Sequence, residues 1–434
     1  MSDQTLRRDL VKSAAAVFTT NLFTGRVFGA NDTLQTAFIG MGRMGMGNMN
    51  AAMKQDKLHV AAVCDIYQPT LDAAVEKTKT QATGVARAVK DFREILADKS
   101  IDAVCISTPD HWHPYMAVEA CKAGKDVYVE KPISVTIADG YKMVQAARKY
   151  NRVVQAGTMQ RSAKHFIDAC ELVRQGRVGD VTMVKTWNYG NGKVEGIGNP
   201  ANGKPPADLD WDMWLGPAPK QEFNKNKWGV DPKAFSHFRW FWDFAGGMMT
   251  DWGVHVLDIA RMGMGEAMPK AVSAMGQKFL IQDNRDTPDT LSAIYEFPKF
   301  MAQYENRMFN ANSMFKQGYG TMFHGTKGTM FVDRSLYRIV PEAGSESMEV
   351  VETKSSDNSN VKHWANFLEC IKKRQRPAAD IEICYKSTVT CLLANISIQS
   401  KQRVDWDEAN NRIAQPELRK YMSRPERAPW KISV

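Results

Sequence analysis

The sequence predicts an α/β fold of two domains, a doubly wound parallel sheet followed by a domain rich in antiparallel strands. At 434 residues the chain is too long for one ordinary hydrophobic core. Strand-like and helix-like segments alternate from Leu34 to Gln155, which is typical of a parallel sheet with helices on both faces. From Val181 strand-like runs replace this alternation, and two of them are joined only by Pro298-Lys299-Phe300. Such a hairpin-length connection indicates antiparallel pairing.

Residues 1–30 resemble an export signal of the twin-arginine type. Arg7-Arg8 is followed by Asp9-Leu10-Val11-Lys12 and then by a mildly apolar stretch rich in Ala and Thr, which ends at Ala30. Phe28, two positions earlier, is unusual before a cleavage site. We therefore expect the twin-arginine export machinery to carry the folded protein to the periplasm or otherwise out of the cytoplasm. The alternative is a tail with a chance arginine pair, which would leave the protein in the cytoplasm.

The composition excludes several classes of protein. With 44% hydrophobic and 24% charged residues, the chain has the balance of a globular protein. No apolar run after the N-terminus approaches the roughly 18 residues of a spanning helix, so we expect no stable membrane span. The net charge is +9, but the longest basic cluster, 372–376, falls at an expected helix end, where cations are favoured. We therefore expect no nucleic-acid partner. The seven cysteines form no CxxC pair or zinc spacing and are interpreted as small buried hydrophobes.

A glycine-rich loop follows the first strand-like run. Leu34 to Ile39 leads into Gly40-Met41-Gly42-Arg43-Met44-Gly45, a helix-like segment covers Asn48 to Lys54, and a second apolar run ends in Asp65. In this context the glycines let the backbone approach a pyrophosphate, the helix N-terminus stabilises its charge, and the acid binds the adenosine ribose. The predicted cofactor residues of this part are Gly40, Gly42, Arg43, Met44, Gly45 and Asp65. Because a carboxylate at this position accepts bonds from a ribose hydroxyl and repels a phosphate, NAD is favoured over NADP.

The alternation continues through three more strands. We expect helices over about Pro69 to Lys79, Pro114 to Ala123 and Ile137 to Tyr150, and strands over Ala103 to Ser107, Asp126 to Val129 and Val153 to Gln155. Ligands bind beyond the carboxyl ends of such strands, where Thr108-Pro109-Asp110-His111 and Glu130-Lys131-Pro132 fall. The alternative is that both segments are ordinary turns.

Four motifs in this order resemble those of the Gfo/Idh/MocA family, which includes glucose–fructose oxidoreductase and inositol dehydrogenase. They are GMGRMG at Gly40, TPDHWH at Thr108, EKP at Glu130 and GGMMTDWGVHVLD at Gly246. The last stretch is close to the family pattern GGGxxxDxGxHxxD, with Met248 in place of the third glycine. The resemblance covers nearly all of residues 33–434.

The resemblance implies a Rossmann domain followed by an α/β domain with a large open, mostly antiparallel sheet. Accordingly we divide the chain into the signal (1–30), a Rossmann NAD-binding domain (31–155), a substrate-binding α/β domain (156–375) and a C-terminal segment that packs back on both domains (376–434). Strand-like runs at 181–189, 271–281, 291–297 and 301–309 agree with this division. Because such sheets often pack together in this family, we expect a homodimer or homotetramer.

The family resemblance also implies a catalytic set of Lys131, Asp251 and His255. An ammonium group after a strand end can donate to the reacting oxygen, and imidazole exchanges protons near neutral pH. Asp251 and His255 are four apart on an expected helix, so the carboxylate can orient the ring. We therefore expect His255 to be the general base in oxidation, Lys131 the oxyanion donor and Asp251 the orienting group. Asp251, His255 and Asp258 lack a partner motif for a metal ion, and no metal is expected.

Other residues are expected to complete the cofactor and substrate sites. The predicted cofactor residues in this second group are Thr108, Pro109, His113, Glu130 and Lys131, and the predicted substrate residues are Arg161, Arg239, Trp240, Trp242, Asp251 and His255. Aromatic faces against sugar rings, with Arg and Asp binding hydroxyls, would make a carbohydrate pocket. A rigid aromatic lid or core is the alternative for the tryptophans, and structural packing is the alternative for His113.

These patterns predict an NAD-dependent oxidoreductase. Its substrate would be a secondary hydroxyl of a sugar, glycoside or related polyol, with hydride transfer to or from a tightly held nicotinamide. The alternative is a redox-assisted glycoside hydrolase or lyase that uses NAD transiently, since oxidising a ring hydroxyl acidifies the neighbouring carbon. A non-catalytic NAD-binding protein is a third possibility, against which the intact catalytic set argues.

Overall fold

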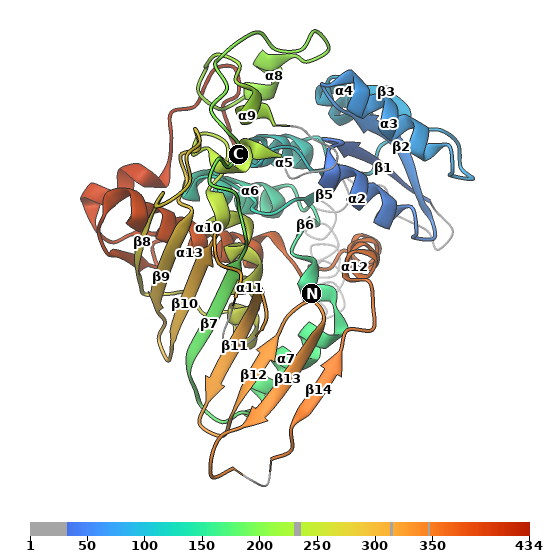
Figure 1. Cartoon of the computed structure of the whole chain (residues 1–434). Helices are drawn as coiled ribbons and strands as arrows, with labels where there is room; N and C mark the ends of the chain where they lie inside the picture. Colours follow the sequence, from blue (N-terminus) through green and yellow to red (C-terminus); the bar gives the residue numbers. More distant parts are fainter. Residues whose placement is uncertain (1–32, 230–235, 313–315, 346–347) are drawn as a thin grey trace, which may run out of the picture.

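The computed structural model describes residues 33–229, 236–312, 316–345 and 348–434. The predicted export signal, residues 1–30, lies outside these ranges. Two sheets dominate the fold, one formed by the N-terminal third of the chain and a larger one formed by the rest (Figure 1). In the part of the chain so described, no helix has both the length and the apolar composition needed to cross a bilayer.

The first sheet has six parallel strands in the order β3-β2-β1-β4-β5-β6. The strands are β1 (Leu34–Ile39), β2 (Leu58–Cys64), β3 (Arg87–Val89), β4 (Ala103–Ile106), β5 (Asp126–Val129) and β6 (Val154–Ala156). The helices that connect them are α2 (Arg43–Ala52), α3 (Gln68–Thr78), α4 (Phe92–Ala97), α5 (His113–Lys122) and α6 (Ile137–Lys149). The predicted doubly wound parallel sheet is confirmed. Its order reverses between β1 and β4, which is where such sheets bind their ligands.

The second sheet has ten strands in the order β14-β13-β12-β11-β7-β10-β9-β8-β15-β16. They are β7 (Val181–Tyr189), β8 (Ala271–Gln277), β9 (Thr290–Glu296), β10 (Met301–Arg307), β11 (Tyr319–Gly325), β12 (Gly328–Val332), β13 (Leu336–Pro341), β14 (Val351–Lys354), β15 (Val404–Asp407) and β16 (Arg412–Ile413). The pairing is antiparallel except between β7 and β10. The predicted mostly antiparallel sheet is thus confirmed, as is the hairpin between β9 and β10.

Strand β8 ends at Gln277, four residues before the end of the run predicted at 271–281. The backbone N–H groups of Phe279, Leu280 and Ile281 all donate to the Asp289 carboxylate, at 2.9, 2.9 and 3.0 Å. A carboxylate that takes three successive donors removes them from the strand ladder, so these apolar residues turn away from the sheet.

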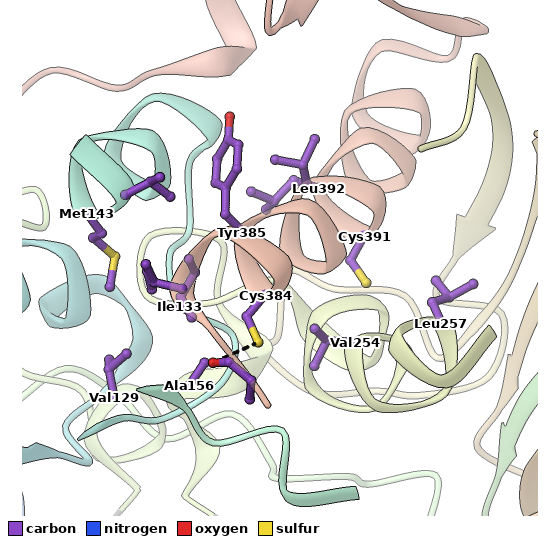
Figure 2. Close-up of a cluster of buried hydrophobic side chains, with 14 of the residues drawn as sticks. Val129, Ile133, Met143, Ala156, Val254, Leu257, Cys384, Tyr385, Cys391 and Leu392 are labelled. Atoms are coloured by element: carbon purple, nitrogen blue, oxygen red, sulfur yellow. Dashed lines mark hydrogen bonds between the residues drawn. The ribbon is translucent and has the colours of Figure 1, made fainter. Parts of the chain in front are cut away.

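Helix α13 (Ile381–Ser400) joins the two halves of the molecule. It packs on α6 and β6 of the first half and on α11 (Gly253–Gly263) and β8 of the second. Figure 2 shows Cys384, Tyr385, Cys391 and Leu392 of this helix between Met143 of α6 on one side and Val254 and Leu257 of α11 on the other. The two sheets therefore share one continuous hydrophobic core.

Helix α12 (Ser359–Lys373) covers the first sheet, although the sequence-based boundaries placed it in the second domain. Trp364 stacks on Tyr128 of β5, with ring centroids 4.7 Å apart, and also contacts Phe38 of β1. The periodicity of an amphipathic helix shows which of its faces is buried but not which sheet it covers.

The segment between β7 and α10 (Gly247–Asp251) forms a small aromatic unit of its own. We call residues 190–229 and 236–246 the aromatic insert; it contains α8 (Trp211–Leu215), α9 (Lys225–Trp228) and η3 (His237–Trp240). Its core contains Trp214, Phe223, Trp240 and Phe244. It touches the first domain through Tyr67, whose backbone bridges to Leu209 and whose ring lies 5.0 Å from that of Trp228.

The C-terminal residues return to the first domain. Trp430 packs edge-on against Trp112, with centroids 4.9 Å apart, and Arg424 donates to the carbonyl oxygen of Asp243 in the aromatic insert. The seven cysteines are all free and buried, so their interpretation as small hydrophobes is confirmed.

Candidate active site

A cavity runs from the glycine loop, past the carboxyl ends of β4 and β5, to the aromatic insert. Gly40 and Gly42 line one end, Lys131 and Asp251 lie further along, and Trp214 belongs to the cover that the insert provides. The cavity therefore lies between the first domain and parts of the chain that follow β7.

Close packing at the glycine loop excludes any side chain at two positions. Gly40 has φ +84°, and a Cβ there would lie 2.7 Å from the backbone nitrogen of Thr108. A Cβ on Gly45 would lie 1.9 Å from the carbonyl oxygen of Gly40. Gly42, in contrast, faces open space. The loop is thus pressed against the end of β4 while its outer side stays accessible.

Helix α2 presents an uncapped N-terminus to this loop. Its N-cap residue is Gly42, which offers no side-chain hydrogen bond, and no acidic residue lies in the first turn. The first backbone N–H groups therefore have no side-chain acceptor and can bind an anion. The residues present fit a dinucleotide pyrophosphate.

Asp65, which follows β2, lines the next part of the cavity wall. Its carboxylate accepts hydrogen bonds from the backbone N–H groups of Met41 (2.7 Å) and Tyr67 (2.9 Å). Burial raises the pKa of Asp65 to about 6, against these hydrogen bonds, so the group is still ionised near pH 7. It can accept a hydrogen bond from a ribose hydroxyl. Lys90 also lines the cavity; the sequence reasoning missed it because the short strand β3 that precedes it was not predicted.

His113 ties together the two loops that follow β4 and β5. Its Nδ1 lies 2.8 Å from the carbonyl oxygen of Pro132, and its Nε2 lies 2.8 Å from that of Thr108. Burial lowers the pKa of His113 to about 4. A neutral ring carries a single N–H, so it donates to one of these two carbonyl oxygens and packs against the other.

Lys131 is held by Asp251. Its Nζ donates to the Asp251 Oδ1 (2.8 Å) and to the Asp251 carbonyl oxygen (3.0 Å), and Arg239 binds the same Oδ1 at 2.7 Å. Burial acts to raise the pKa of Asp251, but Arg239 and Lys131 hold it well below its usual range. The site is thus a cation–carboxylate–cation cluster at the cavity wall.

No hydrogen bond joins His255 to Asp251 among the described residues, although each group acts on the pKa of the other. Helix α10 ends at Asp251 and α11 begins at Gly253, so the two residues do not share one regular helix. The Asp251 carboxylate binds Lys131 and Arg239. It therefore orients Lys131 rather than the His255 ring. His255 is buried, and its Nδ1 has no hydrogen-bond partner among the residues that the structure describes. Burial first, then Lys131 and Arg334, hold the pKa of His255 well below 6.5.

The structure brings together most of the other predicted site residues. Those that line the cavity are Gly40, Gly42, Arg43, Met44, Asp65, Thr108, Pro109, His113, Glu130, Lys131, Arg239 and Asp251. Gly45 packs beneath the loop, as described above. Arg161, Trp240, Trp242 and His255 are not part of the cavity lining.

Arg161, Trp240 and Trp242 have other surroundings. Arg161 is buried and paired with Asp258 of α11 (2.7 Å) and Glu266 (2.6 Å). Trp240 belongs to the core of the aromatic insert, where the Arg285 guanidinium lies 4.2 Å from its ring centroid. Of the two interpretations of Trp240, a carbohydrate pocket or a rigid aromatic core, the structure shows the core. Trp242 is half-buried outside the cavity.

The insert contributes residues that the sequence did not single out one by one. Met213, Trp214, Trp228 and Phe238 line the cavity. The insert is attached through the Trp214 carbonyl oxygen, which lies 3.1 Å from the His111 Nε2 and accepts a bond from the Trp112 Nε1 at 3.0 Å. The tryptophan-rich stretch around residue 211 was the available signal, but its fold over the first domain depends on these long-range contacts.

Comparisons with known proteins agree with this architecture. Residues 34–158 match the family described as "Oxidoreductase family, NAD-binding Rossmann fold", and residues 178–432 match "Oxidoreductase family, C-terminal alpha/beta domain". The chain is 31% identical to the inositol 2-dehydrogenase of Salmonella typhimurium over 36% of its own length and 46% of that protein. It is 29% identical to a glycosyl hydrolase family 109 protein of Shewanella pealeana, over 36% of its own length and 35% of that protein. These alignments thus span less than half of either relative.

Among solved structures, an aldose–aldose oxidoreductase from Caulobacter crescentus has a similar fold. The TM-score is 0.65 at 21% identity, covering 86% of this chain and 100% of the other.

Proposed function

The chain belongs to the Gfo/Idh/MocA family of NAD-binding oxidoreductases, and we propose that its substrate is a secondary hydroxyl of a sugar, glycoside or related polyol. The observation that carries this proposal is the Lys131 ammonium group held at the cavity wall by Asp251. When bound, NAD supplies the acceptor and donor of the hydride. The residues of the chain must then bind the dinucleotide, orient the hydroxyl and move its proton.

The role of each residue follows from the hydrogen-bonding groups that it presents to the cavity. The glycine loop and the start of α2 bind the pyrophosphate, and Asp65 binds the ribose. An ammonium group has three N–H donors. Two of those on Lys131 are directed to Asp251, which leaves one for the substrate oxygen. That donor stabilises the negative charge that grows on the oxygen as the proton and hydride leave.

We also propose that the cofactor is held tightly. Tyr67 and Trp228 meet across the cavity that Gly42 and Asp65 also line, so the aromatic insert restricts exit of a dinucleotide. Tight binding suits a protein that leaves the cytoplasm, where free NAD is made. The basis for export is the sequence pattern of residues 1–30. Replacing Arg7 and Arg8 by lysine should retain the protein in the cytoplasmic fraction of a bacterial host; periplasmic recovery of that variant would contradict the proposal.

The second candidate function is a redox-assisted glycoside hydrolase or lyase. It is favoured by the similarity to glycosyl hydrolase family 109 proteins. Oxidation of a ring hydroxyl acidifies the neighbouring carbon–hydrogen bond, the aglycone leaves by elimination, and the hydride then returns. Both candidates need the same Lys131 donor.

One experiment separates the two. The purified full chain is incubated with free sugars, myo-inositol and aryl glycosides while NADH absorbance and aglycone release are followed together. Reduced cofactor without aglycone release supports the dehydrogenase, and aglycone release without net NADH supports the second candidate. If protein that is shown to contain nucleotide gives neither signal with any of these compounds, both candidate functions are contradicted.

A further inference from the structure

Arg334 is a cation near the proposed reaction centre that forms no ion pair within the described residues. It lies in the turn between β12 and β13, directly after Asp333. The Asp333 Oδ1 accepts bonds from the backbone N–H groups of Ser335 (2.7 Å) and Leu336 (3.0 Å), which anchors this turn. The Arg334 Nε is buried without a hydrogen-bond partner in the described part of the chain. Such an arrangement is costly, because burial disfavours an uncompensated charge.

Aromatic rings connect Arg334 with the expected catalytic residues. The Arg334 Cζ lies 4.9 Å from the centroid of the Trp252 ring. That ring packs against Tyr319 of β11, at 4.8 Å, and against His255 of α11, at 6.0 Å. Trp252 also directly follows Asp251 in the chain. Because Arg334, Trp252 and Tyr319 are each partly exposed, a ligand can reach this group. We call Arg334, Trp252, Tyr319 and His255 the arginine cluster.

The arginine cluster is separate from the part of the cavity that fits the dinucleotide. None of its four members lines that cavity. All four belong to the second domain, whereas the glycine loop, the start of α2 and Asp65 belong to the first. Asp251 lines the cavity and adjoins the arginine cluster through Trp252. A substrate whose hydroxyl lies at Lys131 can therefore extend toward Arg334 without entering the dinucleotide site.

The acids near Arg334 are already bound to other groups. Burial lowers the pKa of Arg334, whereas Asp251 and Glu130 act to raise it. The Lys131 ammonium group and Arg239 both bind the Asp251 Oδ1, however, and Glu130 accepts a bond from the backbone N–H of Lys131 at 3.1 Å. Three cationic side chains thus share two acids, which leaves a positive charge uncompensated. A negatively charged ligand would complete this group.

We propose, on the basis of the proposed function, that Arg334 binds a negatively charged group of the substrate, so that the preferred substrate is a sugar that carries a carboxylate or a phosphate. The planar guanidinium group can donate two parallel N–H bonds to either anion. With Arg334 on the anion and Lys131 on the reacting hydroxyl, the sugar is held at two points. This fixes which of its carbons faces the nicotinamide.

Selectivity between charged and neutral sugars tests the proposal. The full chain is assayed for cofactor reduction with D-glucuronate, D-galacturonate and D-glucose 6-phosphate, each beside its neutral parent sugar. In wild type, kcat/KM for at least one acid should exceed that of its parent by roughly tenfold or more, as a charge-assisted hydrogen bond allows. Arg334→Met removes the charge and should lower this ratio by roughly tenfold or more. Arg334→Lys keeps the charge without the planar fork and should give an intermediate ratio.

The control variant carries the same change on the neighbouring strand. Arg338 of β13 is exposed and donates to Glu352 at 2.8 Å, so Arg338→Met should keep the wild-type ratio. A preference for the uronates identifies a carboxylate as the anion, and a preference for the phosphate ester identifies a phosphate. A wild type that prefers every neutral parent, or the same ratio in wild type and Arg334→Met, would overturn the proposal.

A binding measurement does not depend on turnover. Calorimetric titration of the NADH-loaded chain with the same compounds should show at least one acid binding roughly tenfold more tightly than its parent, and Arg334→Met should remove most of this difference. The variant should also be no less stable than wild type in denaturant, because it removes a charge that lacks an ion-pair partner. Acids that bind through Arg334 without any hydride transfer would count against the proposed function and leave the role of Arg334 intact. Hydride transfer with the same selectivity in Arg334→Met would do the reverse.

Discussion

Gly45 and Gly47 lie two positions apart on α2 and differ in what a side chain would meet. A Cβ on Gly45 would overlap the Gly40 carbonyl oxygen at 1.9 Å, whereas a Cβ on Gly47 meets nothing within 4 Å. Gly45→Ala should displace the glycine loop and weaken NADH binding by roughly tenfold or more, a loss of about 1.4 kcal/mol. Gly47→Ala is the matched control and should leave the dissociation constant unchanged. Fluorescence titration with NADH measures both; equal affinities would contradict the loop's role.

The Lys131 side chain supplies a charge that methionine lacks at similar size. Lys131→Met should keep Asp251 ionised through Arg239, which binds it at 2.7 Å, and should leave the dinucleotide end of the cavity intact. We expect turnover to fall by roughly a hundredfold or more while NADH still binds, since the oxyanion loses its donor. Lys122→Met, a surface variant of a lysine that pairs with Glu119, serves as the control. Turnover close to wild type in Lys131→Met would remove this group from the reaction.

Among the contacts between the aromatic insert and the first domain, the one at Gly216 is especially close. Gly216 ends α8 with φ +46°, and a Cβ there would lie 2.0 Å from the Trp112 ring. Gly216→Ala should lift the insert from the first domain and speed NADH release by roughly tenfold, as loss of about 1.4 kcal/mol would. Gly203→Ala, in the same insert with open space around it, should release NADH at the wild-type rate. Stopped-flow displacement compares them, and identical rates would show that the insert does not retain the cofactor.

Most elements of the first domain could be predicted from the sequence. Strands β1, β2, β4 and β5 were predictable because each is a short apolar run between turn signals, and the residues that follow them form most of the cavity wall. Strand β3 was missed because Arg87 and Ala88 are exposed at a sheet edge and leave no apolar pattern. The pairing of Asp251 with Lys131 and Arg239, instead of with His255, could not be predicted from the sequence. It depends on residues 120 and 12 positions away and on a helix break at Trp252.

For the whole molecule, the open face of the ten-stranded sheet argues for self-association. Side chains of β8 to β10 alternate: one set is buried toward α11 and α13, while Met275, Ile294 and Met301 on the other are 83, 46 and 48% exposed. They lie on the same face as polar side chains such as Ser273, Gln303 and Glu305. Exposed apolar side chains with polar neighbours around them are typical of a protein interface. We therefore expect a homodimer or homotetramer that buries this face, with a second copy of the chain as the partner.

A single charge at the centre of that face should separate the subunits. Ile294 lies opposite Ser273 of β8 and Gln303 of β10, so a glutamate there would be buried in an interface without a partner for its charge. Light scattering after size exclusion should show an oligomer for wild type and a monomer for Ile294→Glu. Val85→Glu, the same kind of change at a residue 53% exposed on the first domain, should keep the oligomer. A monomeric wild type would contradict the expectation, whereas dissociation of both variants would show that added charge alone, and not this face, drives the effect.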